Sequence, residues 1–164
     1  MKISTIIYIG LAVIVFVVLA LYEALRTKRK DVNDQSPFKE LIGKTVTLQR
    51  DVVLAKNIEA FYLEELHFIT EDEELFEGIE KISTLSKGTT ITIESATFLT
   101  NGTSGSTTSN IVGSVLVKEL NKIMKFEYSW GEYHLICLEE PCNYWVFPKA
   151  VWQEKQDFKK YFIE

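Results

Sequence analysis

The sequence has few of the residues that build metal centres and active sites. Its 164 residues include two histidines, His67 and His134, and two cysteines, Cys137 and Cys142. A structural zinc site takes about four such ligands at short spacings, and no histidine or cysteine here lies at such a spacing. Glycine-rich nucleotide-binding motifs and the signatures of common hydrolases are also absent. We therefore expect a protein that is not an enzyme and has no metal or cofactor. A metal-dependent or other enzyme is the alternative.

Positive charge is scarce over most of the chain. Five of the 18 basic residues flank an apolar N-terminal run, and residues 31–164 carry 13 basic and 22 acidic side chains, a formal charge of −9. A surface this negative repels phosphate backbones, so we expect no nucleic-acid partner. A basic protein partner fits the charge, and so does a role in solubility alone.

Charged residues are absent from Ile3 to Tyr22. A helix over this run is about 30 Å long, which matches the hydrocarbon core of a bilayer. The apolar region of a cleaved signal peptide is shorter, about 7–15 residues, although Val18-Leu19-Ala20 resembles a weak cleavage site. The sequence predicts a transmembrane helix over residues 1–25, with residues 3–25 in contact with membrane lipid.

The flanks of this helix differ in charge. Lys2 precedes it, whereas four basic residues follow it: Arg26, Lys28, Arg29 and Lys30. The positive-inside rule therefore places the following domain on the cytoplasmic face of a bacterial inner membrane. A periplasmic or extracellular domain is the alternative. We expect residues 26–37 to form a basic and polar linker and residues 38–164 to form one domain.

The two cysteines lie in the stretch CLEEPC. Four intervening residues that include a proline permit a disulfide between Cys137 and Cys142 if the domain is exported. In a reducing cytosol both remain thiols. The sequence leaves these alternatives open.

The domain is rich in short runs that alternate apolar and polar residues. This period-two pattern, together with β-branched and aromatic content, predicts strands. The runs are KTVTLQ, TTITIES, IVGSVLVK, KIMKFEYSW and YHLICL. The polar NGTSGSTTSN is typical of an exposed loop, and ELNK is typical of a tight turn between two strands. Short antiparallel strands in one small domain favour a barrel or a sandwich.

Two short helices are expected to interrupt this mainly β domain. Thr70 and Glu73 form a potential capping box. The apolar residues that follow at helical spacing are Leu75, Ile79 and Ile82. The acidic residues 71–74 then suit the start of a helix better than a Ca²⁺ loop, because they lack the calcium-loop order of ligands. The chain end predicts a C-terminal helix, with an apolar side formed by Val151, Phe158 and Phe162.

Two stretches sharpen the predicted fold. LSKGTTITI resembles the entry to a strand in bacterial SH3-like domains, and NYWVFPKAVW resembles the aromatic strand, proline and short turn that end SH3 barrels. The resemblance covers about residues 44–152 and implies a small SH3-like antiparallel barrel with a binding role. The acidic stretch and the NGTSGSTTSN loop are longer than such domains usually carry, and the ligand groove cannot be transferred residue by residue.

Aromatic residues are concentrated in the C-terminal half. Tyr128 and Trp130 alternate with polar residues on one strand, so their shared face is either a peptide-binding groove or part of the core. Trp145 and Trp152 flank Pro148, which favours a surface position near the mouth of a barrel. These four residues are the candidate binding residues.

Taken together, the sequence predicts a single-pass, membrane-anchored acidic module that mediates protein–protein interaction. The partner is a protein or a peptide, and the oligomeric state is open. A narrower hypothesis is an immunity-type protein that neutralises a toxin at the membrane, because an acidic surface complements a basic one.

Overall fold

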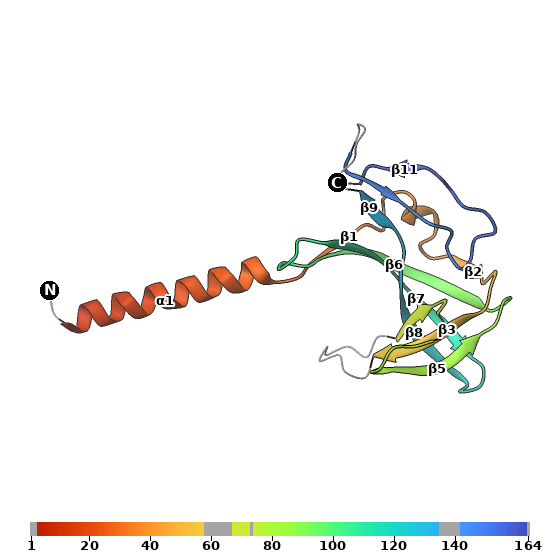
Figure 1. Ribbon diagram of the computed structural model, residues 1–164, viewed down its shortest axis with the longest axis horizontal. Helices are drawn as coiled ribbons and strands as arrows, with labels where there is room; N and C mark the ends of the chain where they lie inside the picture. Colours follow the sequence, from red (N-terminus) through yellow and green to blue (C-terminus); the bar gives the residue numbers. More distant parts are fainter. Residues whose placement is uncertain (1–2, 58–66, 73, 135–141, 164) are drawn as a thin grey trace.

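The computed structural model has a long N-terminal helix followed by a domain of β-strands (Figure 1). It describes residues 3–57, 67–72, 74–134 and 142–163, and the side chains of the helix from Tyr8 onward. The helix α1 (Ile3–Leu25) projects away from the domain as a separate rod. The protein is thus mainly β, as predicted.

Helix α1 is long and apolar enough to cross a membrane. Its window Tyr8–Leu25 has a mean hydropathy of 2.4, and none of it is buried against the rest of the protein. The 23 residues of the helix are about 35 Å long at ~1.5 Å per residue. By its length and composition the helix is thus suited to crossing a bilayer.

Very little chain separates the helix from the sheet. Only Arg26 and Thr27 lie between α1 and strand β1 (Lys28–Asp31), which pairs antiparallel with strand β6 (Thr90–Thr100). Val32, directly after β1, is fully buried. Residues 28–31 of the expected polar linker therefore belong to the sheet, because their backbone pairs with β6. Their charged side chains gave no sign of a strand in the sequence.

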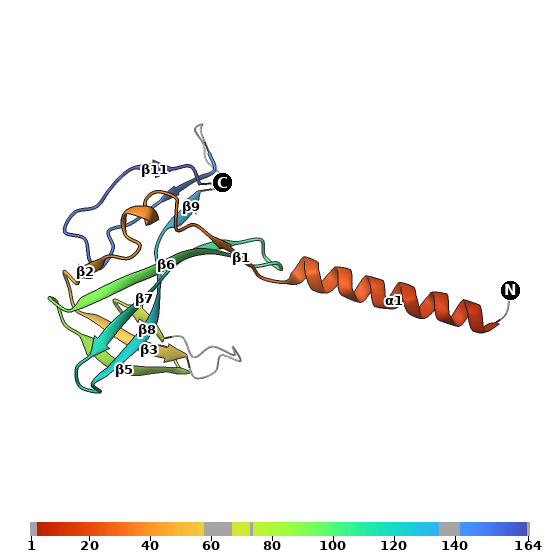
Figure 2. The same cartoon turned by 180° about the vertical axis from the view of Figure 1, so that it is seen from behind.

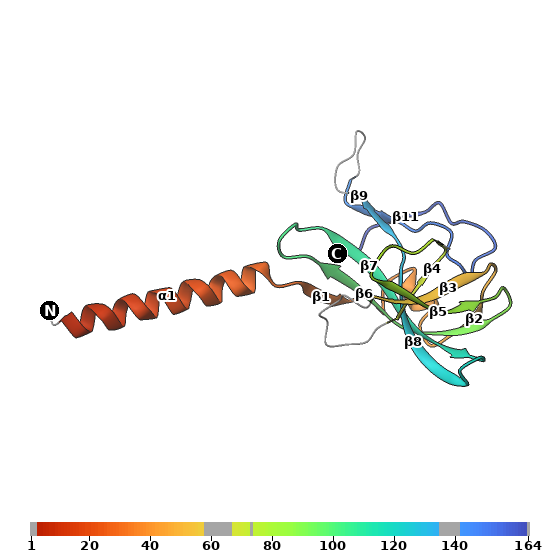
Figure 3. The same ribbon diagram turned by 60° about the horizontal axis from the view of Figure 1, so that its bottom comes forward.

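The largest sheet is built around two consecutive hairpins. Strand β6 pairs with β7 (Thr107–Val117), and β7 pairs with β8 (Lys122–Ser129). The remaining strands are β2 (Thr45–Thr47), β3 (Val52–Asn57), β4 (His67–Thr70) and β5 (Ile79–Leu85). The order is β1-β6-β7-β8-β4-β3-β5, with β2 also on β6. Figures 2 and 3 show the long β6–β7 hairpin running through the middle of the domain.

Strand β6 is long enough to carry two partners on its outer edge. Its first residues pair with β2 and its last residues pair with β1, on either side of an irregularity between Ile93 and Ser95. Between β1 and β2 the chain forms the 3₁₀ turn η1 (Phe38–Glu40). The two edge strands therefore bring Phe38 over the sheet.

The described strands of this sheet do not close into a barrel. β1 and β5 end the path of paired strands, and no pairing joins them in the part of the chain that the structure describes. The sheet is antiparallel except for the parallel pair of β4 and β8. The predicted ELNK turn is confirmed, since it joins β7 to β8 and Asn121 takes the left-handed conformation (φ 47°) there. The SH3-like barrel stays a prediction.

A smaller sheet covers one side of the long hairpin. It has the order β11-β10-β9, from β9 (Glu132–His134), β10 (Tyr144–Val146) and β11 (Lys160–Tyr161). In Figure 2 it lies on the opposite side of β6 from β3 and β5. Two residues separate β8 from strand β9, so the chain passes from the large sheet into the small one at Trp130 and Gly131. Aromatic side chains from both sheets pack against each other there.

The predicted helix at Thr70 is wrong. Thr70 ends β4, and its hydroxyl accepts a hydrogen bond from the amide of Asp72 at 3.1 Å, which makes a tight turn rather than a helix start. Ile79 and Ile82 belong to strand β5, which pairs with β3. Pairing between distant strands here overrides the local capping signal, which agrees with the β-branched content of residues 79–85.

The predicted C-terminal helix is also wrong. The chain after Val151 forms turns and the short strand β11, which pairs with β10. Asp157 accepts hydrogen bonds from the Lys159 amide and the Tyr161 hydroxyl, at 3.1 and 2.8 Å. Side-chain bonds of this kind compete with helical ones. Of the expected apolar side, only Val151 is buried, whereas Phe158 is 81% exposed.

Candidate functional site

The four predicted binding residues lie in the core. Tyr128, Trp130, Trp145 and Trp152 have exposed fractions of 8%, 2%, 2% and 7%. For Tyr128 and Trp130 the sequence left a groove and a core as alternatives, and in the structure both are part of the core. Trp145 and Trp152, for which the sequence favoured a surface position, pack there as well. In this structure none of the four offers a ligand more than a small area.

These aromatic rings form one continuous cluster between the two sheets. Trp130 contacts the rings of Phe147 and Trp152, with centroids 4.7 and 5.6 Å away. Trp145 stacks on Phe98 at 4.4 Å. The Trp130 indole donates to the Pro148 carbonyl at 2.7 Å. The cluster therefore joins the small sheet to the long hairpin, and its main role is structural.

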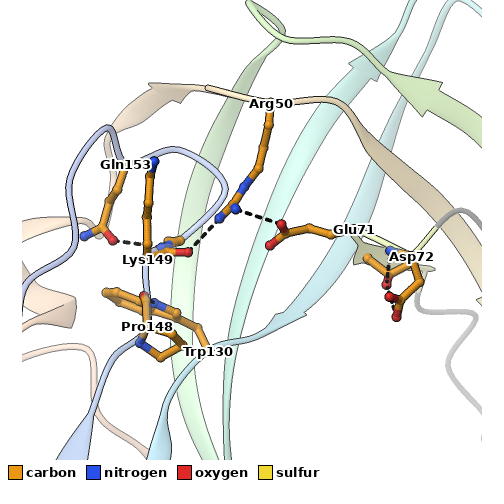
Figure 4. Close-up of polar contacts among 9 residues, drawn as sticks. Arg50, Glu71, Asp72, Trp130, Pro148, Lys149 and Gln153 are labelled. Atoms are coloured by element: carbon orange, nitrogen blue, oxygen red, sulfur yellow. Dashed lines mark hydrogen bonds and ion pairs between the residues drawn. The ribbon is translucent and has the colours of Figure 1, made fainter.

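Arg50 ties three segments together at the rim of this cluster (Figure 4). Its guanidinium donates to the Lys149 carbonyl at 2.6 Å and forms an ion pair with Glu71 at 2.8 Å. These bonds link the β2–β3 connection, the turn that follows β10 and the loop that follows β4. Arg50 Nε and Trp152 Nε1 are buried, and neither has a hydrogen-bond partner among the described residues.

Tyr128 lies near this network and is kept neutral. Burial raises the pKa of Tyr128 to about 12, and the carboxylate of Glu71 contributes to the increase. The positive charge of Arg50 and a backbone hydrogen bond with Val151 act in the opposite direction. An uncharged, buried phenol is a packing group, and it does not have the lowered pKa that a general base requires at neutral pH.

This pKa makes stability fall at high pH. The phenol ionises near pH 10 in the unfolded chain and near pH 12 in the native protein, so its contribution is complete below pH 10 and is lost as the pH rises towards 12. The loss is on the order of 2–3 kcal/mol of unfolding free energy. Urea denaturation of the wild type and of a Tyr128→Phe variant between pH 8 and 12 measures it by difference, because burial also raises the pKa of Tyr161 to about 12. A Tyr128→Phe variant with an unchanged alkaline decline would contradict this origin.

The loop after β4 carries an acidic hollow. Its lining is Glu71, Asp72, Glu74, Leu75 and Phe76, around a volume of about 670 Å³. Phe76 is 79% exposed. Of these lining carboxylates, Glu71 is also ion-paired with Arg50.

Metal-binding geometry is not found in the described parts of the chain. No group of three or more histidine, cysteine or acidic side chains there is arranged to hold a metal ion. Comparisons with protein-family models, curated proteins and solved structures find no match to this chain.

The predicted disulfide is described from one side only. Cys142 is disulfide-bonded, and Cys137, the only other cysteine of the chain, lies outside the described residues. His134, the nearest histidine, stacks on Tyr144 with centroids 5.0 Å apart. The His134 ring thus packs on the neighbouring strand of the small sheet.

Sequence reasoning missed an exposed apolar surface at the β7–β8 turn. Leu116, Leu120 and Ile123 are 49%, 53% and 70% exposed. Leu116 and Ile123 are directly opposed across the hairpin, and Leu120 lies in the turn. The signal was present in the sequence, because these residues fall out of phase with the buried positions of the same two strands.

Proposed function

We propose that the protein is a single-pass, membrane-anchored binding module that holds an acidic β domain close to the bilayer for interaction with another protein. The observation that carries this proposal is the junction between helix and domain. Only Arg26 and Thr27 separate α1 from β1. A domain attached this closely cannot move far from the membrane surface, so its reach is limited to partners at the same membrane.

A second contact at the junction supports this arrangement. A Cβ atom built on Gly102, in the β6–β7 loop, would lie 2.5 Å from the carbonyl carbon of Leu25. Figures 1 and 3 both show this loop beside the end of α1. The helix and the sheet are thus in contact at two points in the chain, which restricts how the domain tilts relative to the helix.

The SH3-like character is part of the proposal. In support, the LSKGTTITI stretch forms a strand end, a tight turn and a strand start, with the Thr89 amide donating to the Ser86 carbonyl at 3.0 Å. Gly88 has φ +91° in this turn. The NYWVFPKAVW stretch supplies β10 and the turn after it.

Site-directed photo-crosslinking of the full-length protein in intact cells tests the binding role. A photoreactive residue replaces one exposed position at a time: Lys44, Phe76, Ile123 or Phe158. A module with a specific partner gives a discrete heavier species from some positions and none from others. Absence of a crosslinked protein at every position would contradict the proposal.

We propose further that the domain faces the cytoplasm, because the basic flank Arg26 to Lys30 follows the helix. The disulfide at Cys142 favours the opposite side as the second candidate, because disulfides persist in oxidising compartments. The two locations make opposite predictions for the same molecule.

Alkaline phosphatase fused after Glu164 distinguishes them, since this reporter is active only outside the cytoplasm. For a cytoplasmic domain we expect an inactive fusion. An active fusion would place the domain outside, where the disulfide at Cys142 persists.

A further inference from the structure

The tip of the β7–β8 hairpin exposes apolar and basic side chains, with Leu116 and Ile123 paired on one face and Lys122 paired with the buried Val117 on the other. This hairpin-tip surface consists of Leu116, Lys118, Leu120, Lys122 and Ile123, all of which are exposed. Both lysines are without an ion pair among the residues that the structure describes. A basic, apolar tip stands out on a domain whose formal charge is −9.

The acidic residue of the turn, Glu119, is exposed but is bonded to a neighbouring strand. Glu119 accepts a short hydrogen bond from the hydroxyl of Ser83, a residue of β5 that is 7% exposed. This bond attaches the turn to the neighbouring strand. The hairpin tip is therefore held in place, which lowers the entropy lost when a partner binds.

The hairpin tip lies far from the bilayer. Strand β7 begins just after the loop that touches α1 and ends at the tip. Its 11 residues extend about 36 Å at ~3.3 Å per residue. Figures 1 and 3 show the β7–β8 turn on the side of the domain away from the helix. Insertion of the tip into the membrane that holds α1 is thus disfavoured by the length of the strand.

We propose that the hairpin-tip surface is the docking site of the module, and that its partner is a protein surface with an apolar centre and an acidic rim. The apolar side chains supply the contact area, and the two lysines select a partner of opposite charge. This inference rests on the proposed function and names the chemistry of its partner.

Photo-crosslinking at position 123 of the full-length chain, in the presence of charge variants, tests the assignment. We expect a Lys118→Gln/Lys122→Gln double variant to reduce the yield of the crosslinked species at least fivefold. A Lys44→Gln/Lys155→Gln variant makes the same change in net charge at exposed positions away from the tip and should leave the yield unchanged. Sequencing the crosslinked segment should find Asp or Glu beside apolar residues.

Three results would overturn the assignment. They are equal yields from both charge variants, a crosslinked segment that is basic, and crosslinks to lipid in place of protein. Vesicles containing phosphatidylglycerol provide a direct control, because tip-dependent binding to them would identify a membrane as the ligand. Thermal melting confirms that the variants are folded. Crosslinks at other positions but not at 123 would refute only the docking site at the hairpin tip. Crosslinks at no position would also refute the proposed binding role of the domain.

Discussion

Phe38→Ala is expected to lower the free energy of unfolding by about 3–5 kcal/mol, the range for removal of a buried aromatic ring. Phe38 is fully buried. Its ring makes edge contacts with Phe98, Trp130 and Phe147, at centroid distances of 5.9, 6.1 and 5.3 Å. These partners belong to β6, to the β8–β9 connection and to the chain that follows β10, so the alanine leaves a cavity where the two sheets meet.

Urea denaturation of the full-length protein in detergent micelles, followed by tryptophan fluorescence, measures this effect. All three tryptophans are buried in the domain and report on its unfolding. Phe158→Ala is the matched control, because the same ring is removed from a side chain that is 81% exposed. The control should change stability by less than about 0.5 kcal/mol. A loss below about 1 kcal/mol for Phe38→Ala would show that this ring does not join the sheets.

Gly131→Ala is expected to cost about 3 kcal/mol or more. The glycine has φ +119°, a conformation that L-residues rarely adopt, and strain of this kind costs roughly 1–3 kcal/mol. A Cβ atom there would also lie 2.6 Å from Phe147 Cε1 and 3.2 Å from Trp145 Cε3. Overpacking adds roughly 1–3 kcal/mol, because these buried rings have little room to move.

Gly105→Ala separates the two costs. Gly105 has φ +71°, and a Cβ atom there would meet nothing within 4 Å. Only the backbone cost applies, about 1–2 kcal/mol. The same denaturation experiment compares the two variants. If both lost equal stability, the contact between Gly131 and the aromatic cluster would contribute nothing.

Much of the β7–β8 hairpin could be predicted from the sequence. In β7 and β8 one face is buried and the other is exposed, so apolar and polar residues alternate as the pleat requires. Strand β3 escaped this reasoning for a physical reason. Its first residues, Val52 to Ala55, are all buried, so both faces are covered and no alternation appears.

The strand β5 was misread because its neighbours are remote in sequence. Ile79 and Ile82 have a spacing compatible with a helix, but their segment pairs with β3, and β4 runs parallel to β8. Pairings such as these depend on the arrangement of the whole sheet. A local capping signal at Thr70 carries no information about them.

The candidate site was likewise predictable in part from local pattern and in part only from the tertiary structure. Alternation placed Tyr128 and Trp130 on one face of a strand, and burial confirms the shared face. Whether that face was a groove or a core depended on Phe38 and on the small sheet, which cover it. The hairpin-tip surface left a signal in the sequence, because Leu116 and Ile123 fall out of phase with their neighbours, but the tertiary structure decided which phase is buried.

The amino-acid sequence by itself determined the apolar rod, its charged flank and the β content of the domain, because these follow from composition and local period. The tertiary structure decided which strands are neighbours, which aromatic face is covered and how far the apolar turn lies from the helix. Those properties arise from contacts between segments that are distant in the chain, and no local pattern encodes such contacts.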